Sequence, residues 1–184
     1  MTIFWGVLAG LALAALIWMA LSRFVGFDAQ KPGDYAPGRL DMDPKRALSG
    51  KLLVDGVLYG PLGRVVSRFT ADMNCDWDGD ELTINEVFKY DSGTEQTRRW
   101  VLNLGPDAKL RGGAEDILGA EGQVVGDALS LRYRIKLPAA AGGYVLSVKD
   151  WMYALDNGTL VNRSQMRKFG FKVAELVASI RPAT

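Results

Sequence analysis

Charged side chains that alternate with apolar ones on predicted strands are the residues of this sequence best suited to chemistry. Glu86 shares the alternating parity of Ile84 and Phe88, and Arg98 shares that of Trp100. If these faces point into a core, burying either charge without a partner costs several kcal/mol. Opposite residues of a hairpin lie about 5 Å apart, so we expect Glu86 and Arg98 to form a buried ion pair.

A second polar group lies in a predicted β-hairpin whose strands flank Asn157-Gly158, a strong signal for a tight turn. This hairpin carries Asp150 among aromatic residues and is too apolar to be a fully solvated ribbon. By the same argument about buried charges, we expect Asp150 to pair with Lys168 or Arg163.

Three uses of these inward charges remain open. They can be structural ion pairs that fix strand register, or polar anchors for the headgroup of a ligand inside an apolar cup. They can also be an acid and a base, with Glu86 and Asp150 catalysing a reaction and burial raising the pKa of one of them. The candidate ligand-binding residues are Glu86, Arg98, Trp100, Tyr133, Asp150, Trp151, Asn162 and Lys168.

Composition excludes several classes of site. Histidine is absent and Cys75 is the single cysteine, which removes Ser-His-Asp triads, Cys-His nucleophiles, His-ligated metals and internal disulfides. We therefore expect no metal and no cofactor, and we expect Cys75 to be a small buried apolar residue. From Ser49 onward the chain holds 17 Lys and Arg against 17 Asp and Glu, a balance that argues against a nucleic-acid binder.

Residues 1–24 are expected to form a transmembrane anchor. Ile3 to Leu21 carries no charge, and as a helix its 19 residues would span about 28 Å, close to the hydrocarbon thickness of a bilayer. Trp5 and Trp18 lie toward its two ends, as interfacial aromatic residues do. A cleaved signal peptide is the alternative, but no Lys or Arg precedes the apolar run, which also ends in a poor cleavage site.

Residues 25–48 are expected to be a flexible linker, because Pro32, Pro37 and Pro44 deny them regular structure. A flexible coil of about 20 residues spans roughly 25 Å. Positive charges follow the apolar run and none precedes it, which favours a cytoplasmic domain. An N-terminal anchor ahead of a β-domain is, however, typical of an exported protein, so charge alone leaves the orientation open.

Residues 49–184 alternate with a period of two, which predicts an all-β domain. Apolar residues recur at every second position, for example from Phe69 to Trp77, and turns with glycine separate the runs. The segment 171–180 fits a helix or a strand, and we predict a strand because the first edge of the sheet needs a partner. About eight to ten strands make an antiparallel up-and-down barrel or a strongly curved sheet the natural solution.

A stripe of cations runs along one predicted strand. Arg132, Arg134 and Lys136 point outward if Leu131 and Tyr133 point inward. Such a stripe is either a solvated face or a contact for anionic lipid headgroups, where each charge contributes about 1 kcal/mol. The sequence leaves both interpretations open.

Motifs spread over about residues 49–180 resemble the DUF3833 family of bacterial proteins. The residues that carry the resemblance are Asn85-Glu86-x-Phe88-x-Tyr90-Asp91-x-Gly93, Arg98-x-Trp100, Ala114-x-Asp116-x-x-Gly119-x-x-Gly122, Gly126-x-Ala128-Leu129-x-x-x-Tyr133, Asp150-Trp151-Met152-Tyr153 and Asn162-Arg163-Ser164-x-Met166-x-Lys168-Phe169-Gly170. The resemblance implies a lipocalin-like barrel that is exported to the bacterial envelope, and it brings no established catalytic residue. Many members look like lipoproteins, and this chain departs from them because no cysteine follows its apolar run.

These observations predict a single-pass protein of the bacterial inner membrane. Its lipocalin-like barrel would face the periplasm and bind a hydrophobic small molecule, such as a lipid or a fatty acyl chain. The partners expected are the membrane, through the N-terminal helix, and that ligand, with no nucleic acid. Two alternatives remain: an interaction module of the envelope with a solid barrel and an exposed apolar patch, and a lipid-modifying enzyme that uses the buried carboxylates Glu86 and Asp150.

Overall fold

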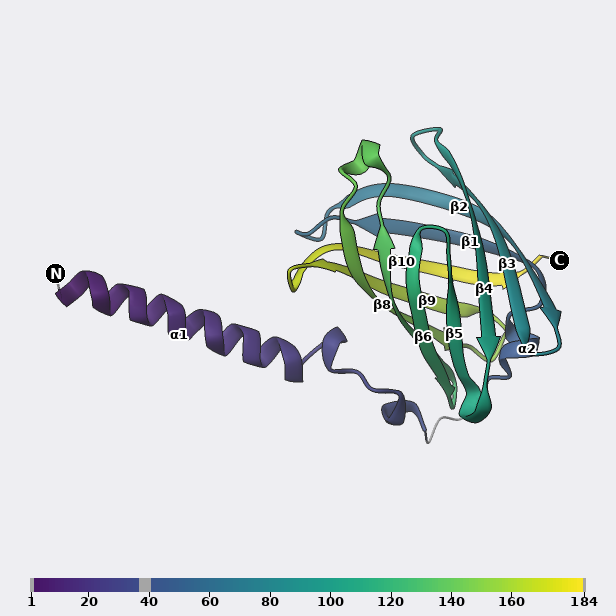
Figure 1. Cartoon of the computed structure of the whole chain (residues 1–184), viewed down its shortest axis with the longest axis horizontal. Helices are drawn as coiled ribbons and strands as arrows, with labels where there is room; N and C mark the ends of the chain where they lie inside the picture. The colour runs from purple at the N-terminus through teal and green to yellow at the C-terminus, as the bar shows by residue number, and fades with distance from the viewer. Residues whose placement is uncertain (1, 37–40, 184) are drawn as a thin grey trace.

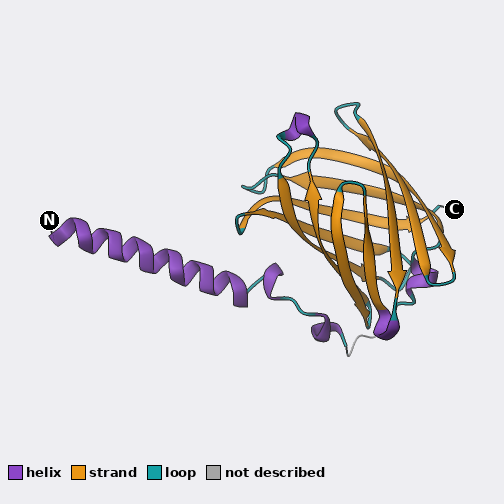
Figure 2. Ribbon diagram, viewed as in Figure 1, coloured by secondary structure: helices purple, strands orange, loops and turns teal. Residues whose placement is uncertain are grey.

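Ten antiparallel strands close into a barrel in the structure of the chain, a computed structural model that describes residues 2–36 and 41–183 (Figure 1 and Figure 2). The strands are β1 (Gly50–Tyr59), β2 (Val65–Asp78), β3 (Glu81–Tyr90), β4 (Glu95–Leu104), β5 (Lys109–Ala114), β6 (Ile117–Val125), β7 (Ala128–Lys136), β8 (Val145–Ala154), β9 (Leu160–Lys168) and β10 (Phe171–Pro182), with single 3-10 turns η3 (Pro106–Ala108) and η4 (Ala139–Ala141) between them. Each strand pairs with its neighbours in sequence, and β1 pairs with β10. The predicted all-β up-and-down barrel is confirmed.

Alternating burial explains why these residues form strands. Along β2, the inward residues Phe69, Ala71, Met73 and Cys75 are buried, whereas the residues between them are exposed. A strand places successive side chains on opposite faces, so one face supplies the core and the other meets solvent. Cys75 is the buried apolar residue that was expected, and its burial raises the pKa of the thiol to about 12.

The last strand removes both edges of the sheet. β10 runs antiparallel to β1, with Ile180 opposite Val54 and Ala178 opposite Gly56. Residues 171–180, which fit either a helix or a strand in sequence, are therefore a strand, as predicted. Closure leaves no unpaired ladder of backbone N–H and C=O groups along the sheet.

Connections alternate between the two ends of the barrel because every strand is antiparallel to its neighbours. One end carries the β2–β3, β4–β5, β6–β7 and β8–β9 connections and the short helix α2 (Pro44–Ala47), and we call it the α2 end. The other carries the β1–β2, β3–β4, β5–β6, β7–β8 and β9–β10 connections, and we call it the rim end. Figure 1 shows the α2 end at the lower right and the rim end at the upper left.

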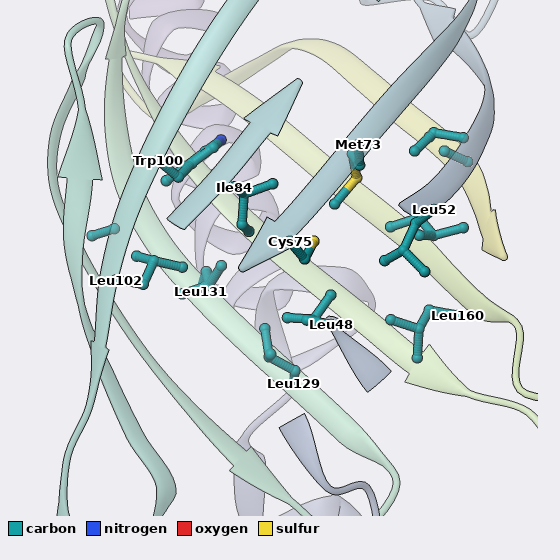
Figure 3. Close-up of a cluster of buried hydrophobic side chains, with 14 of the residues drawn as sticks. Leu48, Leu52, Met73, Cys75, Ile84, Trp100, Leu102, Leu129, Leu131 and Leu160 are labelled. Atoms are coloured by element: carbon teal, nitrogen blue, oxygen red, sulfur yellow. The ribbon is translucent and has the colours of Figure 1, made fainter. Parts of the chain in front are cut away.

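The α2 end is plugged. Asp43 caps α2 and accepts a hydrogen bond from the backbone N–H of Lys45 at 2.9 Å. The indole N–H of Trp77 donates to the carbonyl of Leu48 at 2.7 Å, which fixes the residue that follows the helix. The side chains of Leu48 and Met42 are buried in the barrel core, and Figure 3 shows Leu48 among the core side chains.

An N-terminal helix, α1 (Thr2–Phe24), precedes the barrel and extends away from it (Figure 1). Within residues 2–36 and 41–183, no helix reaches the length and apolarity that crossing a membrane requires. The expected transmembrane anchor over residues 1–24 is therefore not supported by the structure.

Residues 27–35, which were expected to lie in a flexible linker, pack on the outer face of β6 to β9, and we call them the docked segment. It contains the 3-10 turns η1 (Phe27–Ala29) and η2 (Pro32–Tyr35). Asp28 forms ion pairs with Lys149 at 3.0 Å and with Arg167 at 2.6 Å. Proline and glycine do prevent a long helix here, as expected, but tertiary contacts hold the segment in place. Residues 37–40 of the expected linker lie outside the described residues.

Aromatic residues complete the attachment of the docked segment. Phe27 is buried in a small outer cluster with Trp151, and the ring of Tyr35 lies 5.1 Å from the ring of Trp151. The hydroxyls of Tyr35 and Tyr153 both donate to the side-chain carbonyl of Gln30, at 2.5 Å and 2.6 Å. The aromatic surface of the 150–171 hairpin, which is too apolar for solvent, is covered in this way.

Close approach of backbones predicts a sharp effect at Gly112. A Cβ atom added there would lie 1.9 Å from the carbonyl oxygen of Val101 in the neighbouring strand, whereas one added at Gly33 would meet nothing within 4 Å. We expect Gly112→Ala to lower the free energy of unfolding by about 2 kcal/mol or more, because backbone must move. Gly33→Ala should change it little. Urea denaturation checks this, and equal effects of the two variants would contradict the predicted packing.

Candidate ligand-binding cavity

A cavity of about 250 Å³ lies inside the barrel. Leu48 bounds it at the α2 end, and Leu137 and Pro138 of the β7–β8 connection line it at the rim end. Its wall is largely apolar, with Phe69 and Phe88 among the rings that line it. The cavity therefore extends from the plug toward the rim end.

Arg98 organises the charged part of the cavity wall. Its guanidinium donates to the carboxylate of Asp116 from Nε and Nη2, at 3.1 Å and 2.9 Å. The same group lies 3.9 Å from the carboxylate of Glu86 and 5.5 Å from the ring of Phe88. Glu86 is opposite Arg98 in the β3–β4 register, so the expected pair is confirmed, although Asp116 is the closer partner.

Glu86 is a largely buried carboxyl group with a raised pKa. Its side chain is 13% exposed, and burial raises its pKa from 4.5 to about 7. The positive charge of Arg98 and the indole N–H of Trp100, which donates to Glu86 at 3.1 Å, lower the pKa without cancelling the effect of burial. Near neutral pH, Glu86 is therefore able to hold or release a proton.

Asp150 is a second buried carboxyl group that lines the cavity. It accepts hydrogen bonds from the amide of Asn162 and from the hydroxyl of Ser164, the latter at 2.6 Å. Burial raises the pKa of Asp150, while these hydrogen bonds act in the opposite direction. Two neutral polar groups on β9 thus take the place of the cation that the sequence led us to expect.

The expected partners of Asp150 lie elsewhere. Arg163 points outward and pairs with Glu175 at 2.5 Å. Lys168 lies at the rim, 3.1 Å from the ring centre of Tyr144. Pairing of Asp150 with Lys168 or Arg163 was therefore a wrong prediction. In the β8–β9 register, Asp150 lies opposite Ser164 and Trp151 lies opposite Arg163. Because successive residues of a strand point to opposite faces, the side chains of Asp150 and Arg163 lie on opposite faces of the sheet.

Aromatic side chains frame the two carboxyl groups. The ring of Trp100 meets the ring of Tyr133 edge-to-face, with centres 5.2 Å apart. Burial raises the pKa of Tyr133 well above its usual value, so its hydroxyl remains protonated and can donate a hydrogen bond into the cavity. The site thus combines apolar surface with donors and acceptors at fixed positions.

The predicted site residues fall into two groups. Those that line the cavity are Glu86, Arg98, Trp100, Tyr133, Asp150 and Asn162. Two predicted residues do not line the cavity. Trp151 lies outside the barrel against the docked segment, and Lys168 lies at the rim. Whether the inward residues bind a ligand stays a prediction.

Sequence reasoning missed two polar residues of the cavity. Asp116 follows β5 in a Gly-rich passage without clear alternation, although it belongs to one of the motifs that resemble the family. Ser164 shares the parity of Asn162, and that signal could have found it. Within the described part of the chain, no group of three or more His, Cys, Asp and Glu side chains is placed to hold a metal ion.

A family model and several solved structures match the chain. The family model described as "Protein of unknown function (DUF3833)" matches residues 21–182. Rv2717c from M. tuberculosis is 17% identical with a TM-score of 0.53, over 75% of this chain and 94% of that one. The S-type phycobiliprotein lyase CPES from Guillardia theta is 5% identical with a TM-score of 0.50, over 75% and 89%. A redesigned β-barrel, mFAP0, bound to DFHBI, is 12% identical with a TM-score of 0.42, over 74% and 99%. No curated protein sequence matches the chain.

The raised pKa of Glu86 predicts a pH dependence of stability. Between about pH 4.5 and pH 7 the folded protein holds a proton on Glu86 that the unfolded chain has released. The free energy of unfolding should therefore fall as pH rises through this window, by at most about 3 kcal/mol from this group, and level off above it. Asp150, whose pKa is also raised, acts in the same direction.

Substitution isolates the contribution of Glu86. Urea denaturation at a series of pH values should give a flatter profile for Glu86→Gln than for the unaltered protein. Glu121→Gln is the matched control, because its carboxylate is 76% exposed and 3.9 Å from Arg111. Parallel profiles for Glu86→Gln and the unaltered protein would contradict the raised pKa.

Proposed function

This chain belongs to the DUF3833 family, and we propose that its barrel binds an apolar small molecule with the polar end of that molecule at Glu86, Arg98 and Asp116. The observation that carries the proposal is the cavity of about 250 Å³ inside the closed barrel. An apolar cavity with a few convergent polar groups is the usual form of a small-molecule site. The fold shared with the phycobiliprotein lyase is consistent with such a use.

The unfilled volume argues against a barrel that serves only as a solid scaffold. Cavities in protein cores cost about 24 cal/mol per Å³. Larger side chains at Ala178 or Val54, which line the cavity, would fill part of it. A barrel whose role lay only in its outer surface has no reason to keep this space.

Charge in the cavity indicates what kind of polar end the ligand has. Glu86, Asp116 and Asp150 supply three carboxyl groups, whereas Arg98 is the single guanidinium among the cavity residues, and Lys136 is exposed at the rim. Arg98 already donates to Asp116 through two of its nitrogens. An amine or hydroxyl that donates to Glu86 or Asp150 is therefore favoured over a carboxylate, which would meet unpaired acceptors.

The size of the cavity limits the ligand. A volume of about 250 Å³ has room for roughly eight groups of the size of a water molecule. Octylamine, octanol and octanoate match this volume and differ only in their polar ends. A longer acyl chain would have to leave the barrel through the rim end, since Leu48 blocks the other end.

Acid–base catalysis on the bound molecule is a second candidate, favoured by the presence of Glu86 and Asp150 in one cavity. The negative charge of Asp150 contributes to the raised pKa of Glu86, an arrangement that separates an acid from a base. A ligand recovered chemically unchanged after incubation with the protein would support binding alone. A changed mass, abolished in Asp150→Asn, would support the enzyme.

Attachment to a bacterial membrane, with the barrel in the periplasm, is part of the proposal. It is supported by the exposure of large apolar side chains along α1, among them Ile3, Phe4 and Leu11, and by the envelope location that the family resemblance implies. Alkaline phosphatase fused after Thr184 should be active in intact cells, and the full chain should sediment with membranes. Activity found only in the soluble cytoplasmic fraction would contradict both parts.

Ligand preference tests the binding proposal. At pH 8, where Glu86 is mostly ionised and octylamine is a cation, octylamine should bind more tightly than octanol, and octanol more tightly than octanoate. Glu86→Gln should lower the affinity for octylamine roughly tenfold to hundredfold, because a charged hydrogen bond is lost. The control Glu121→Gln should leave that affinity unchanged. Isothermal titration measures this. Equal binding of octanoate would contradict the assigned polar end, and binding of none of the three would contradict the cavity site.

A further inference from the structure

Most of the large exposed apolar side chains of the barrel gather at the rim end, and Val87 and Val177 are exposed on its outer wall. Those at the rim end are Leu62, Val65, Val66, Leu118, Tyr144, Val145, Phe169 and Phe171. Leu62 and Phe169 are each 90% exposed. Of the described barrel residues, Leu155 is the single large apolar side chain exposed at the α2 end. An apolar cluster confined to one end of a barrel indicates a surface that meets an apolar partner.

Three neighbouring connections present this cluster. The strand order β1-β10-β9-β8-β7 places the β1–β2, β9–β10 and β7–β8 connections side by side around the barrel. These connections carry Leu62, Phe169 and Tyr144, and we call the three connections the apolar rim. Figure 1 shows them projecting from the same end. Leu137 and Pro138, beside Tyr144, also line the cavity, so the apolar rim borders its entrance.

The tip of the β9–β10 turn holds a large ring at a conformational cost. Phe169 has φ of 52°, and Gly170 has φ of 84°. Such a turn is readily adopted by Asn-Gly or Gly-Gly, whereas a bulky residue at positive φ is strained. Phe169 is not part of the barrel core, and its ring contact is with the ammonium of Lys168 at 5.5 Å. The Phe169 ring is therefore exposed on a backbone conformation that is costly for a bulky residue, and it adds nothing to the barrel core.

The apolar rim is also positively charged. Residues 60–66, 136–145 and 166–172 contain five Lys and Arg and no Asp or Glu. Two of these cations are paired with carboxylates of neighbouring segments, Arg167 with Asp28 and Lys172 with Glu175. Lys168 lies between the rings of Tyr144 and Phe169, and Arg64 is exposed. The β3–β4 and β5–β6 connections, on the other side of the entrance, carry carboxylates of their own. Apolar tips with cations between them match the interface of an anionic bilayer.

The docked segment brings α1 to the same end. Asp28 forms an ion pair with Arg167, the second-last residue of β9, next to the β9–β10 connection. Since α1 ends at Phe24, its exposed apolar residues leave the barrel close to the apolar rim. The C-terminal end of α1 is thus near the apolar rim and not near the plugged end.

We propose that the apolar rim docks onto an anionic lipid surface, so that the cavity entrance faces the bilayer. Leu62, Phe169 and Tyr144 insert among the lipid headgroups, and Arg64 and Lys168 contact the phosphates. A second copy of the chain or a protein partner fits less well, because three separate tips with cations between them offer no continuous apolar surface. Docking is independent of what the cavity binds, and it stands even if the cavity binds none of the three octyl compounds.

Site-specific fluorescence on the full chain tests the docking. Cys75 is 2% exposed and its thiol pKa is about 12, so an introduced cysteine can be labelled with an environment-sensitive dye. The labelled variants are Leu62→Cys and Phe169→Cys at the rim and Leu155→Cys at the α2 end. All three carry the same α1, so a difference between them reports the orientation of the barrel. The probe is a vesicle of equal parts phosphatidylglycerol and phosphatidylcholine.

Docking predicts a strong blue shift and increase of emission at residues 62 and 169 with anionic vesicles, and none at residue 155. Arg64→Gln or Lys168→Gln removes one cation, and each should lower the affinity for vesicles, measured from the emission at residue 62, about fivefold. Phe169→Asn, which suits the turn, should reduce that response while the melting temperature stays the same or rises. Equal responses at all three positions would overturn the proposal, as would a rim response that needs no vesicles and grows with protein concentration.

Discussion

The ion pair of Arg98 with Asp116, with Glu86 beside it, is the interaction on which the interior of this barrel depends. Desolvating three charged groups costs several kcal/mol each before partners are counted. Apolar residues of similar volume commonly replace such a cluster at no loss of stability. The β3–β4 register sets Glu86 opposite Arg98, and the β5–β6 turn brings Asp116 to the same guanidinium. A barrel that needed only to fold would not require this arrangement.

The cluster and the cavity explain each other. Charged groups inside a barrel need room for solvent or a ligand, and the cavity supplies it beside Glu86 and Asp150. The two ends of the barrel then take different roles. Leu48 and Trp77 close one end through a buried leucine and an indole hydrogen bond. The other end is left to the connections, three of which form the apolar rim, and any exchange of a ligand has to occur there.

Much of this could be predicted from local pattern, and the rest could not for identifiable reasons. A period of two placed Glu86 and Arg98 on inward faces, because parity follows from strand geometry alone. Parity also requires Asp150 and Trp151 to face opposite ways, but it does not say which face is the core. That choice depends on the docked segment, which covers Trp151 from 124 positions earlier in the chain at Phe27. Asp116 was missed because glycines interrupt the alternation around it.

Native mass spectrometry of the gently purified full chain tests whether the cavity holds a ligand. We expect a discrete additional mass from a small apolar molecule with an amine or hydroxyl end, which is lost in Glu86→Gln and kept in Glu121→Gln. A bare polypeptide mass that does not change when octylamine or octanol is added would show that the barrel binds no such ligand.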